Sequence, residues 1–118
     1  MDKSNEDHWE KVAIKILAQC AKLKDSYWFQ EAVDPVKFNI LDYFDIISNP
    51  MDLGTVRKKI THNSYGSAKE FVYDMNLIWT NCYKYNGDSH DISKCAQELE
   101  KNFKEYFTSY GLDKYMNE

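Results

Sequence analysis

The stretch from Ser67 to Asn86, SAKEFVYDMNLIWTNCYKYN, decides the fold of this chain. Its apolar side chains recur three and four positions apart, which is the spacing of one face of an α-helix. The main stripe consists of Phe71, Met75, Ile78, Cys82 and Tyr85. Ser67 and Glu70 have the spacing of a capping box, in which both side chains accept hydrogen bonds from backbone N–H groups. The stretch therefore predicts a helix that begins after Ser67 and ends near Asn86-Gly87, since both of those residues tolerate the left-handed conformation that terminates helices.

Two further segments show the same spacing, one on each side of this stretch. Residues 9–24 combine an apolar stripe with a lysine-rich opposite face, and residues 92–110 carry another stripe. We expect Asp91 to cap the start of the latter and Gly111 to stop it, with Leu112 as a hydrophobic latch. The 118 residues include only two prolines and four glycines. This composition favours an all-α fold over a turn-rich β fold, and the length fits one domain.

The segment between the first two helices, residues 25–66, is far longer than the usual connection of about 4–6 residues. It is rich in large apolar side chains, so we expect an ordered, packed loop rather than a solvated linker. Pro50 interrupts it, and Asp52 is placed to cap a short helix from Leu53 to Ile60. Binding sites concentrate on loops held by a rigid scaffold, which makes this loop a candidate for one.

The composition excludes several classes of function. The chain has 15 lysines and arginines and 19 aspartates and glutamates, which gives a net charge of -4. This balance argues against direct nucleic-acid binding, which needs a basic face, and suits a partner that is itself basic. The sequence has no run of about 18 apolar residues, which a membrane span would need. Its first ten residues are polar, unlike a secretory signal. Three cysteines without close pairing indicate free, buried thiols in a reducing compartment.

Motifs of catalysis are missing from the sequence. It has no GxSxG, no HExxH, no phosphate-binding glycine loop and no dinucleotide fingerprint. Cys82, His90 and Cys95 could be imagined as zinc ligands, but both cysteines fall on apolar helical stripes and a closed zinc site needs a fourth ligand. We therefore expect no enzyme, no metal site and no cofactor.

Acidic side chains gather in the two connections between helices. Residues 25–50 hold five carboxylates against the single Lys37, a local sum of -4. Residues 86–91 add Asp88 and Asp91. If both connections meet at one end of the helices, that end attracts a cationic peptide.

Asn86 has two interpretations at this stage. With Gly87 it is a common helix ending, and taken alone that explanation is the stronger one. Alternatively its side-chain amide, with two donor hydrogens and one acceptor oxygen, faces a cavity and suits a ligand that is itself a neutral amide. Tyr43 and the triplet Tyr27-Trp28-Phe29, each taken alone, fit ordinary core positions.

Four stretches together resemble the bromodomain family. They are FQEAVD at 29–34, DYF at 42–44, NPMDLGT at 49–55 and NCYKYN at 81–86. Val33-Asp34, Asn39 and the last stretch make the chain most similar to the BET-type group. The resemblance covers residues 8–110, so we expect the domain there, with residues 1–7 and 111–118 as flanking segments.

The resemblance implies a left-handed four-helix bundle with a long structured loop between the first two helices. It also implies a pocket for acetyl-lysine. Asn86 matches the asparagine that binds the acetyl group, and Tyr43 matches the tyrosine that holds a bridging water. The remaining positions of the implied pocket are Trp28, Phe29, Val33, Phe38, Ile40, Tyr85 and Ile92. Phe38 stands where leucine is usual, which should reshape the rim.

By the same resemblance, the partners are acetylated lysine-rich peptides such as histone tails, and the chain is a nuclear, monomeric reader in chromatin and transcription regulation. Direct nucleic-acid and membrane binding are not expected. The alternative is a helical protein–protein interaction module whose pocket is degenerate. A preference for acetylated over unmodified peptides would distinguish the two.

Overall fold

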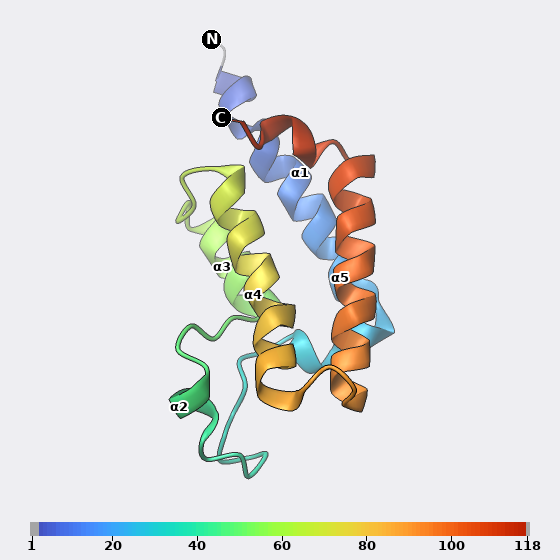
Figure 1. The fold of residues 1–118 in the computed structure, drawn as a ribbon. Helices are drawn as coiled ribbons and strands as arrows, with labels where there is room; N and C mark the ends of the chain where they lie inside the picture. Colours follow the sequence, from blue (N-terminus) through green and yellow to red (C-terminus); the bar gives the residue numbers. More distant parts are fainter. Residues whose placement is uncertain (1–2, 118) are drawn as a thin grey trace.

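A computed structural model describes residues 3–117 of the chain, with side chains described for residues 9–117. Residues 1, 2 and 118 of the expected flanking segments lie outside the described residues. The described chain is helical and contains no strand, which confirms the all-α prediction (Figure 1). Its α-helices are α1 (Lys3–Lys22), α2 (Tyr43–Ile46), α3 (Leu53–Thr61), α4 (Ala68–Asn86) and α5 (Asp91–Ser109). Two 3₁₀ helices follow α1 and α5, namely η1 (Lys24–Phe29) and η2 (Leu112–Tyr115).

Helices α1, α3, α4 and α5 pack side by side as a bundle, as predicted (Figure 1). The predicted stripe of α4 faces the core, since Phe71 and Met75 are fully buried there. Burial of such side chains is the main favourable contribution to folding. The largest fully buried side chains are Trp79, Phe71, Ile16, Ile47, Met75 and Leu99. Within residues 3–117, no helix is long and apolar enough to cross a membrane.

The first helix differs from its predicted range of residues 9–24. It begins at Lys3 and ends at Lys22, because Leu23 takes an extended conformation with φ -70° and ψ 138°. The hydroxyl of the buried Ser26 donates to the carbonyl oxygen of Leu23 at 2.7 Å and to that of Ala21 at 3.2 Å. These bonds satisfy carbonyl groups that the end of α1 leaves without helical partners.

Two of the predicted helix caps are wrong in detail. The Ser67 side chain makes no capping bond, and Oε1 of Glu70 accepts from the N–H of Gly66 at 2.9 Å instead of from that of Ser67. Asp91 is the first residue of α5 and not its cap. His90 holds the cap position, and its Nδ1 accepts from the N–H of Ile92 at 3.1 Å.

The start of α3 and the end of α5 agree with the sequence. Asp52 accepts from the N–H of Thr55 at 2.9 Å and from its hydroxyl at 2.7 Å, as a helix cap does. At the other end of the chain, Gly111 has a φ of 83° and Leu112 is fully buried as the expected latch. Gly54 follows the Asp52 cap, and its N–H donates to the carbonyl oxygen of Gln30 at 3.0 Å. A Cβ at position 54 would lie 2.9 Å from that oxygen, so only glycine allows this close contact between the long loop and α3.

The long loop is ordered, but it is less packed than predicted. Its order comes from hydrogen bonds: Oδ1 of Asp34 accepts two backbone N–H groups, and Nδ2 of Asn81 on α4 donates to the carbonyl of Asn49 at 2.8 Å. However, several large apolar side chains of the segment are exposed. They are Tyr27, Trp28, Val36, Phe38, Leu41, Phe44 and Ile46. The loop extends beyond one end of the bundle, where it leaves these side chains without a core to cover them (Figure 1).

Candidate functional site

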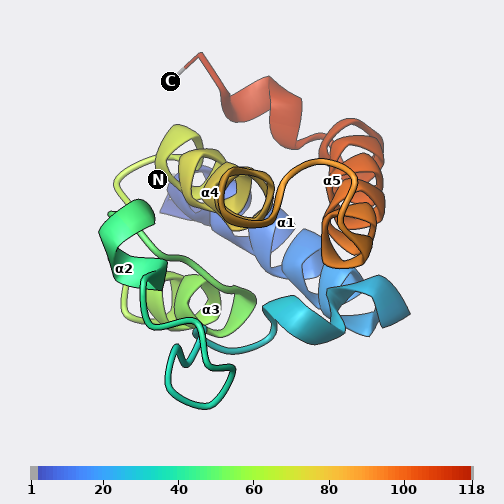
Figure 2. The same cartoon turned by 60° about the horizontal axis from the view of Figure 1, so that its bottom comes forward.

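One end of the bundle brings together three segments that are distant in sequence. The end of α4, the connection from α4 to α5 and the loop that carries α2 all gather there (Figure 1). Figure 2 brings this end forward and shows the α2 loop on one side of α4 and the turn into α5 on the other. The two acidic connections between helices therefore lie at the same end of the molecule. This was the condition for that end to attract a cationic peptide.

Asn86 is the last residue of α4, and its side chain is half-buried. Its Nδ2 donates to the carbonyl oxygen of Cys82 at 3.2 Å and lies 3.6 Å from the Cys82 sulfur. The helix ends at the next residue, because Gly87 takes a φ of 85° and its N–H donates to the carbonyl of Tyr83. The helix ending is thus made by Gly87, while the Asn86 amide is held against the last turn of α4.

Tyr43 is placed against this end of α4 by the short helix α2. Only 7% of it is exposed, and its ring centroid lies 5.0 Å from that of Tyr85. Burial raises the pKa of Tyr43, and the neighbouring Cys82 adds to the effect. The Tyr85 hydroxyl donates to Oδ1 of Asp42 at 2.5 Å, and mainly this bond raises the pKa of Tyr85 to about 12. Both hydroxyls are therefore protonated at neutral pH, and that of Tyr85 already gives its hydrogen to Asp42.

The other predicted pocket residues fall into three groups. Phe29 is buried, and Ile92 is half-buried at the start of α5, and both pack in the main core. Val33 and Ile40 are half-buried on the long loop. Trp28 and Phe38 are 47% and 48% exposed, and their rings meet edge to face with centroids 6.4 Å apart. This aromatic pair forms an exposed apolar surface on the loop rather than a closed wall.

Sequence reasoning missed two residues behind Asn86. The sulfur of Cys82 lies 3.7 Å from the hydroxyl oxygen of Ser93, which is fully buried on α5. Burial raises the pKa of Cys82 more than its hydrogen bonds with Ser93 and Asn86 lower it, so the thiol is neutral. The available clue was that Ser93 shares helical spacing with the buried Ala96 and Leu99, which places a polar side chain inside an apolar stripe.

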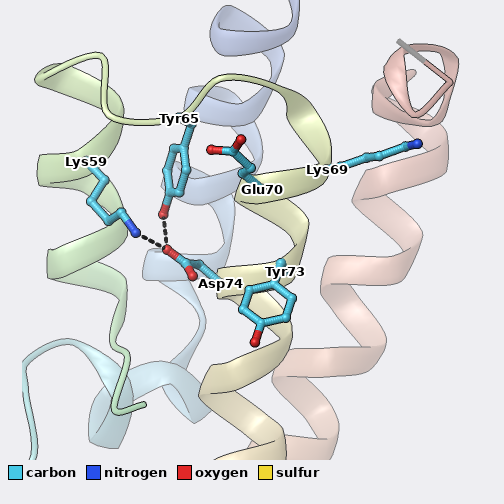
Figure 3. A pocket seen from close by; sticks show the side chains of 6 residues that line it. All are labelled: Lys59, Tyr65, Lys69, Glu70, Tyr73 and Asp74. Atoms are coloured by element: carbon cyan, nitrogen blue, oxygen red, sulfur yellow. Dashed lines mark hydrogen bonds and ion pairs between the residues drawn. The ribbon is translucent and has the colours of Figure 1, made fainter.

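A hollow of about 360 Å³ lies near the opposite end of α4 (Figure 3). Lys59 of α3 and the buried Tyr65 both point at Asp74 of α4 there. Nζ of Lys59 and the Tyr65 hydroxyl each lie 2.7 Å from the same oxygen, Oδ2 of Asp74. Burial and the Asp74 carboxylate raise the pKa of Tyr65, which keeps its hydroxyl a donor. These groups satisfy one another, so we interpret the cluster as a structural link between α3 and α4.

The described residues contain no group of three or more His, Cys, Asp or Glu side chains placed to hold a metal ion. Cys82, His90 and Cys95, which could be imagined as ligands from the sequence, have other surroundings. Cys82 contacts Ser93, and His90 caps α5.

Comparison with known proteins decides the family. The family model described as Bromodomain matches residues 14–98. The chain belongs to the bromodomain family. It is 42% identical over 94 residues to the SWR1 complex bromodomain subunit bdf1 of Schizosaccharomyces pombe. This alignment covers 80% of this chain and 16% of that protein. A second bromodomain-containing protein of the same organism is 42% identical over 104 residues, covering 81% of this chain and 14% of that protein.

An ankyrin repeat, bromo and BTB domain-containing protein of Dictyostelium discoideum is 43% identical over 86 residues, or 73% of this chain and 11% of that protein. The chain therefore spans about a sixth or less of the length of these relatives. Bromodomains are generally acetyl-lysine readers in chromatin and not enzymes. The matches place the chain in the family and not in a subgroup, so its likeness to the BET-type group stays a prediction.

Proposed function

We propose that this bromodomain reads acetyl-lysine in histone tails, with Asn86 as the residue that binds the acetyl carbonyl. The observation that carries the proposal is the packing of the buried Tyr43 on Tyr85, next to Asn86 in the last turn of α4, with the half-buried Ile92 at the start of α5. The bound group would lie against Phe29, Val33, Ile40 and Tyr85, with the Trp28–Phe38 pair at the rim.

The chemistry of the modified lysine fits these side chains. Acetylation replaces an ammonium with a neutral amide that ends in a methyl group. The acetyl oxygen needs a donor, because leaving it buried without one would cost about 1–3 kcal/mol. Asn86 supplies that donor, and the Tyr43 hydroxyl reaches the same oxygen through a water, which is nearly as good as a direct bond. The aliphatic walls enclose the methyl group and the lysine stem.

Discrimination against unmodified lysine comes from desolvation. Moving an ammonium into an apolar pocket costs several kcal/mol unless a carboxylate pairs with it there. The carboxylates at this end, among them Asp42, Asp45 and Asp88, are exposed on the surface. They attract the other lysines of a histone tail without offering a partner inside the pocket. A nuclear, monomeric module spanning residues 8–110, similar to the BET-type group, is part of the same proposal.

Titration with paired histone-tail peptides, acetylated and unmodified, tests the function. We expect binding of the acetylated peptide only, and we expect Asn86→Ala to abolish it with little change in melting temperature. Asn76→Ala, the same change at an exposed position on α4, serves as the control. Equal binding of both peptides would favour the alternative, a helical interaction module with a degenerate pocket. A large fall in melting temperature for Asn86→Ala would make Asn86 a structural cap instead.

A further inference from the structure

The donor hydrogens of Asn86 are directed at a single residue of its own helix. Nδ2 lies 3.2 Å from the carbonyl oxygen of Cys82 and 3.6 Å from the Cys82 sulfur. A backbone carbonyl oxygen can only accept, which identifies the atom facing it as the amide nitrogen. An amide nitrogen carries two hydrogens, so the carbonyl takes one and the thiol is the neighbour of the other.

The thiol is fixed in turn by α5. Cys82 is 7% exposed, and its sulfur lies 3.7 Å from the hydroxyl of the fully buried Ser93. All buried side-chain nitrogen and oxygen atoms among the described residues have hydrogen-bond partners, and for Ser93 this partner is the Cys82 sulfur. Because the thiol is buried and neutral, it is a weak acceptor.

We propose that Cys82, held by Ser93, is a positioning residue that sets how readily Asn86 gives a hydrogen to an acetyl carbonyl. This inference rests on the proposed function. The weak acceptor orients the amide, yet a carbonyl oxygen displaces it easily because N–H···O bonds are stronger than N–H···S contacts. The chemistry of position 82 therefore tunes the affinity for acetyl-lysine without touching the ligand.

Substitutions at position 82 distinguish two effects: orientation of the Asn86 amide, and competition with the acetyl oxygen for its hydrogen. Cys82→Ser places a strong oxygen acceptor beside the amide, and we expect it to weaken binding of an acetylated peptide about threefold to tenfold, the value of roughly one net hydrogen bond. Cys82→Ala removes the acceptor and with it the orientation of the amide, and we expect a smaller fall in affinity, to within about threefold of the wild-type value. Calorimetric titration of both variants with one acetylated histone-tail peptide measures the effect.

A spectroscopic readout tests the relay through Ser93. We expect Ser93→Ala to shift the Asn86 side-chain amide signals in ¹⁵N–¹H spectra, although no hydrogen bond joins Ser93 to Asn86. Ser26→Ala, at a serine that is equally buried beside α1, is the matched control and should leave these signals in place. Cys20→Ser, at a buried thiol on α1, should lower the melting temperature without changing the affinity.

The possible outcomes distinguish failure of the positioning role from failure of the proposed reader function. If the wild type prefers the acetylated peptide and Cys82→Ser binds it equally well, the positioning role is overturned and the reader function stands. If the wild type has no such preference, both are overturned. Should Cys82→Ser not fold, unchanged Asn86 signals in Ser93→Ala would by themselves overturn the relay.

Discussion

At the end of α4, the helix ending and the proposed acetyl-binding amide belong to different residues, Gly87 and Asn86. The helix ending depends on Gly87, whose positive φ and N–H bond close α4, and the carboxamide of Asn86 adds only bonds to Cys82. Truncation of the side chain therefore leaves the helix ending in place. The same reasoning applies to Tyr43, whose ring packs on Tyr85 while its hydroxyl is the group that we propose contacts a ligand water. At both positions the packing and the polar group can be tested independently.

Tyr43→Phe keeps the ring and removes the hydroxyl. We expect the affinity for an acetylated peptide to fall about threefold to tenfold, because one water-mediated bond is lost. The melting temperature should change little, since the contact with Tyr85 remains. Tyr73→Phe is the control, because Tyr73 is 61% exposed on α4 near the opposite end. Undiminished affinity in Tyr43→Phe would remove this hydroxyl from the site.

At the level of helices, the sequence predicted which helices form better than it predicted their caps and the packing of the loop between them. The stripes of α1 and α4 could be identified because burial selects apolar residues at a fixed period. The cap of α5 could not, because His90 and Asp91 both carry acceptors and only the side-chain conformation decides between them. The long loop has no period, so its apolar content suggested packing where the structure exposes Val36 and Leu41.

The candidate site also contains features that the sequence could predict and one that it could not. The motifs predicted Asn86 and Tyr43 as site residues, and their role there stays a prediction. The contact of Ser93 with Cys82 was not, because it joins two helices and depends on how α4 and α5 are aligned. Periodicity gives the inward face of each helix, but not which residues of two faces meet.

The His90 cap is an element-level feature with a direct test. His90→Ala should destabilise the start of α5 by about 1 kcal/mol, the usual cost of losing a cap. His90→Asn should restore most of this stability, because asparagine is a strong capping residue. Urea denaturation monitored by circular dichroism measures both variants. If Asp91→Ala cost more than His90→Ala, the cap would be assigned to the wrong residue.

Across the whole molecule, the Asp74 link and the proposed binding site lie toward opposite ends of α4. Asp74 links α3 to α4 through Lys59 and Tyr65 and lies in the first half of α4, whereas Asn86 is its last residue. Asp74→Ala leaves the buried Tyr65 hydroxyl without an acceptor, so we expect a loss of about 1–3 kcal/mol in the free energy of unfolding. The affinity for an acetylated peptide should be unchanged under conditions where the variant is folded. A matching loss of affinity would show that the two ends are coupled.

A second link joins α4 to α5 and makes stability depend on pH. Oε1 of Glu100 accepts from the Tyr83 hydroxyl at 2.7 Å, and Oε2 pairs with Nζ of Lys104 at 2.7 Å. Partial burial raises the pKa of Glu100, but the bonds from Lys104 and Tyr83 outweigh it, so the pKa lies below its ordinary value. A carboxyl whose pKa is lowered by folding stabilises the folded state above its unfolded-state pKa, and this stability is lost as the pH falls through the folded-state pKa.

We therefore expect Glu100→Gln to be less stable than the wild type by about 0.5–1 kcal/mol at neutral pH. The difference should stay constant down to about pH 5 and shrink below about pH 4, where the unfolded carboxyl also takes up its proton. Thermal melts of the two proteins across this range measure it, with Glu98→Gln, at an exposed position on the same helix, as the control. A difference that persists to pH 3 would mean that the link acts through the shape of the side chain rather than its charge.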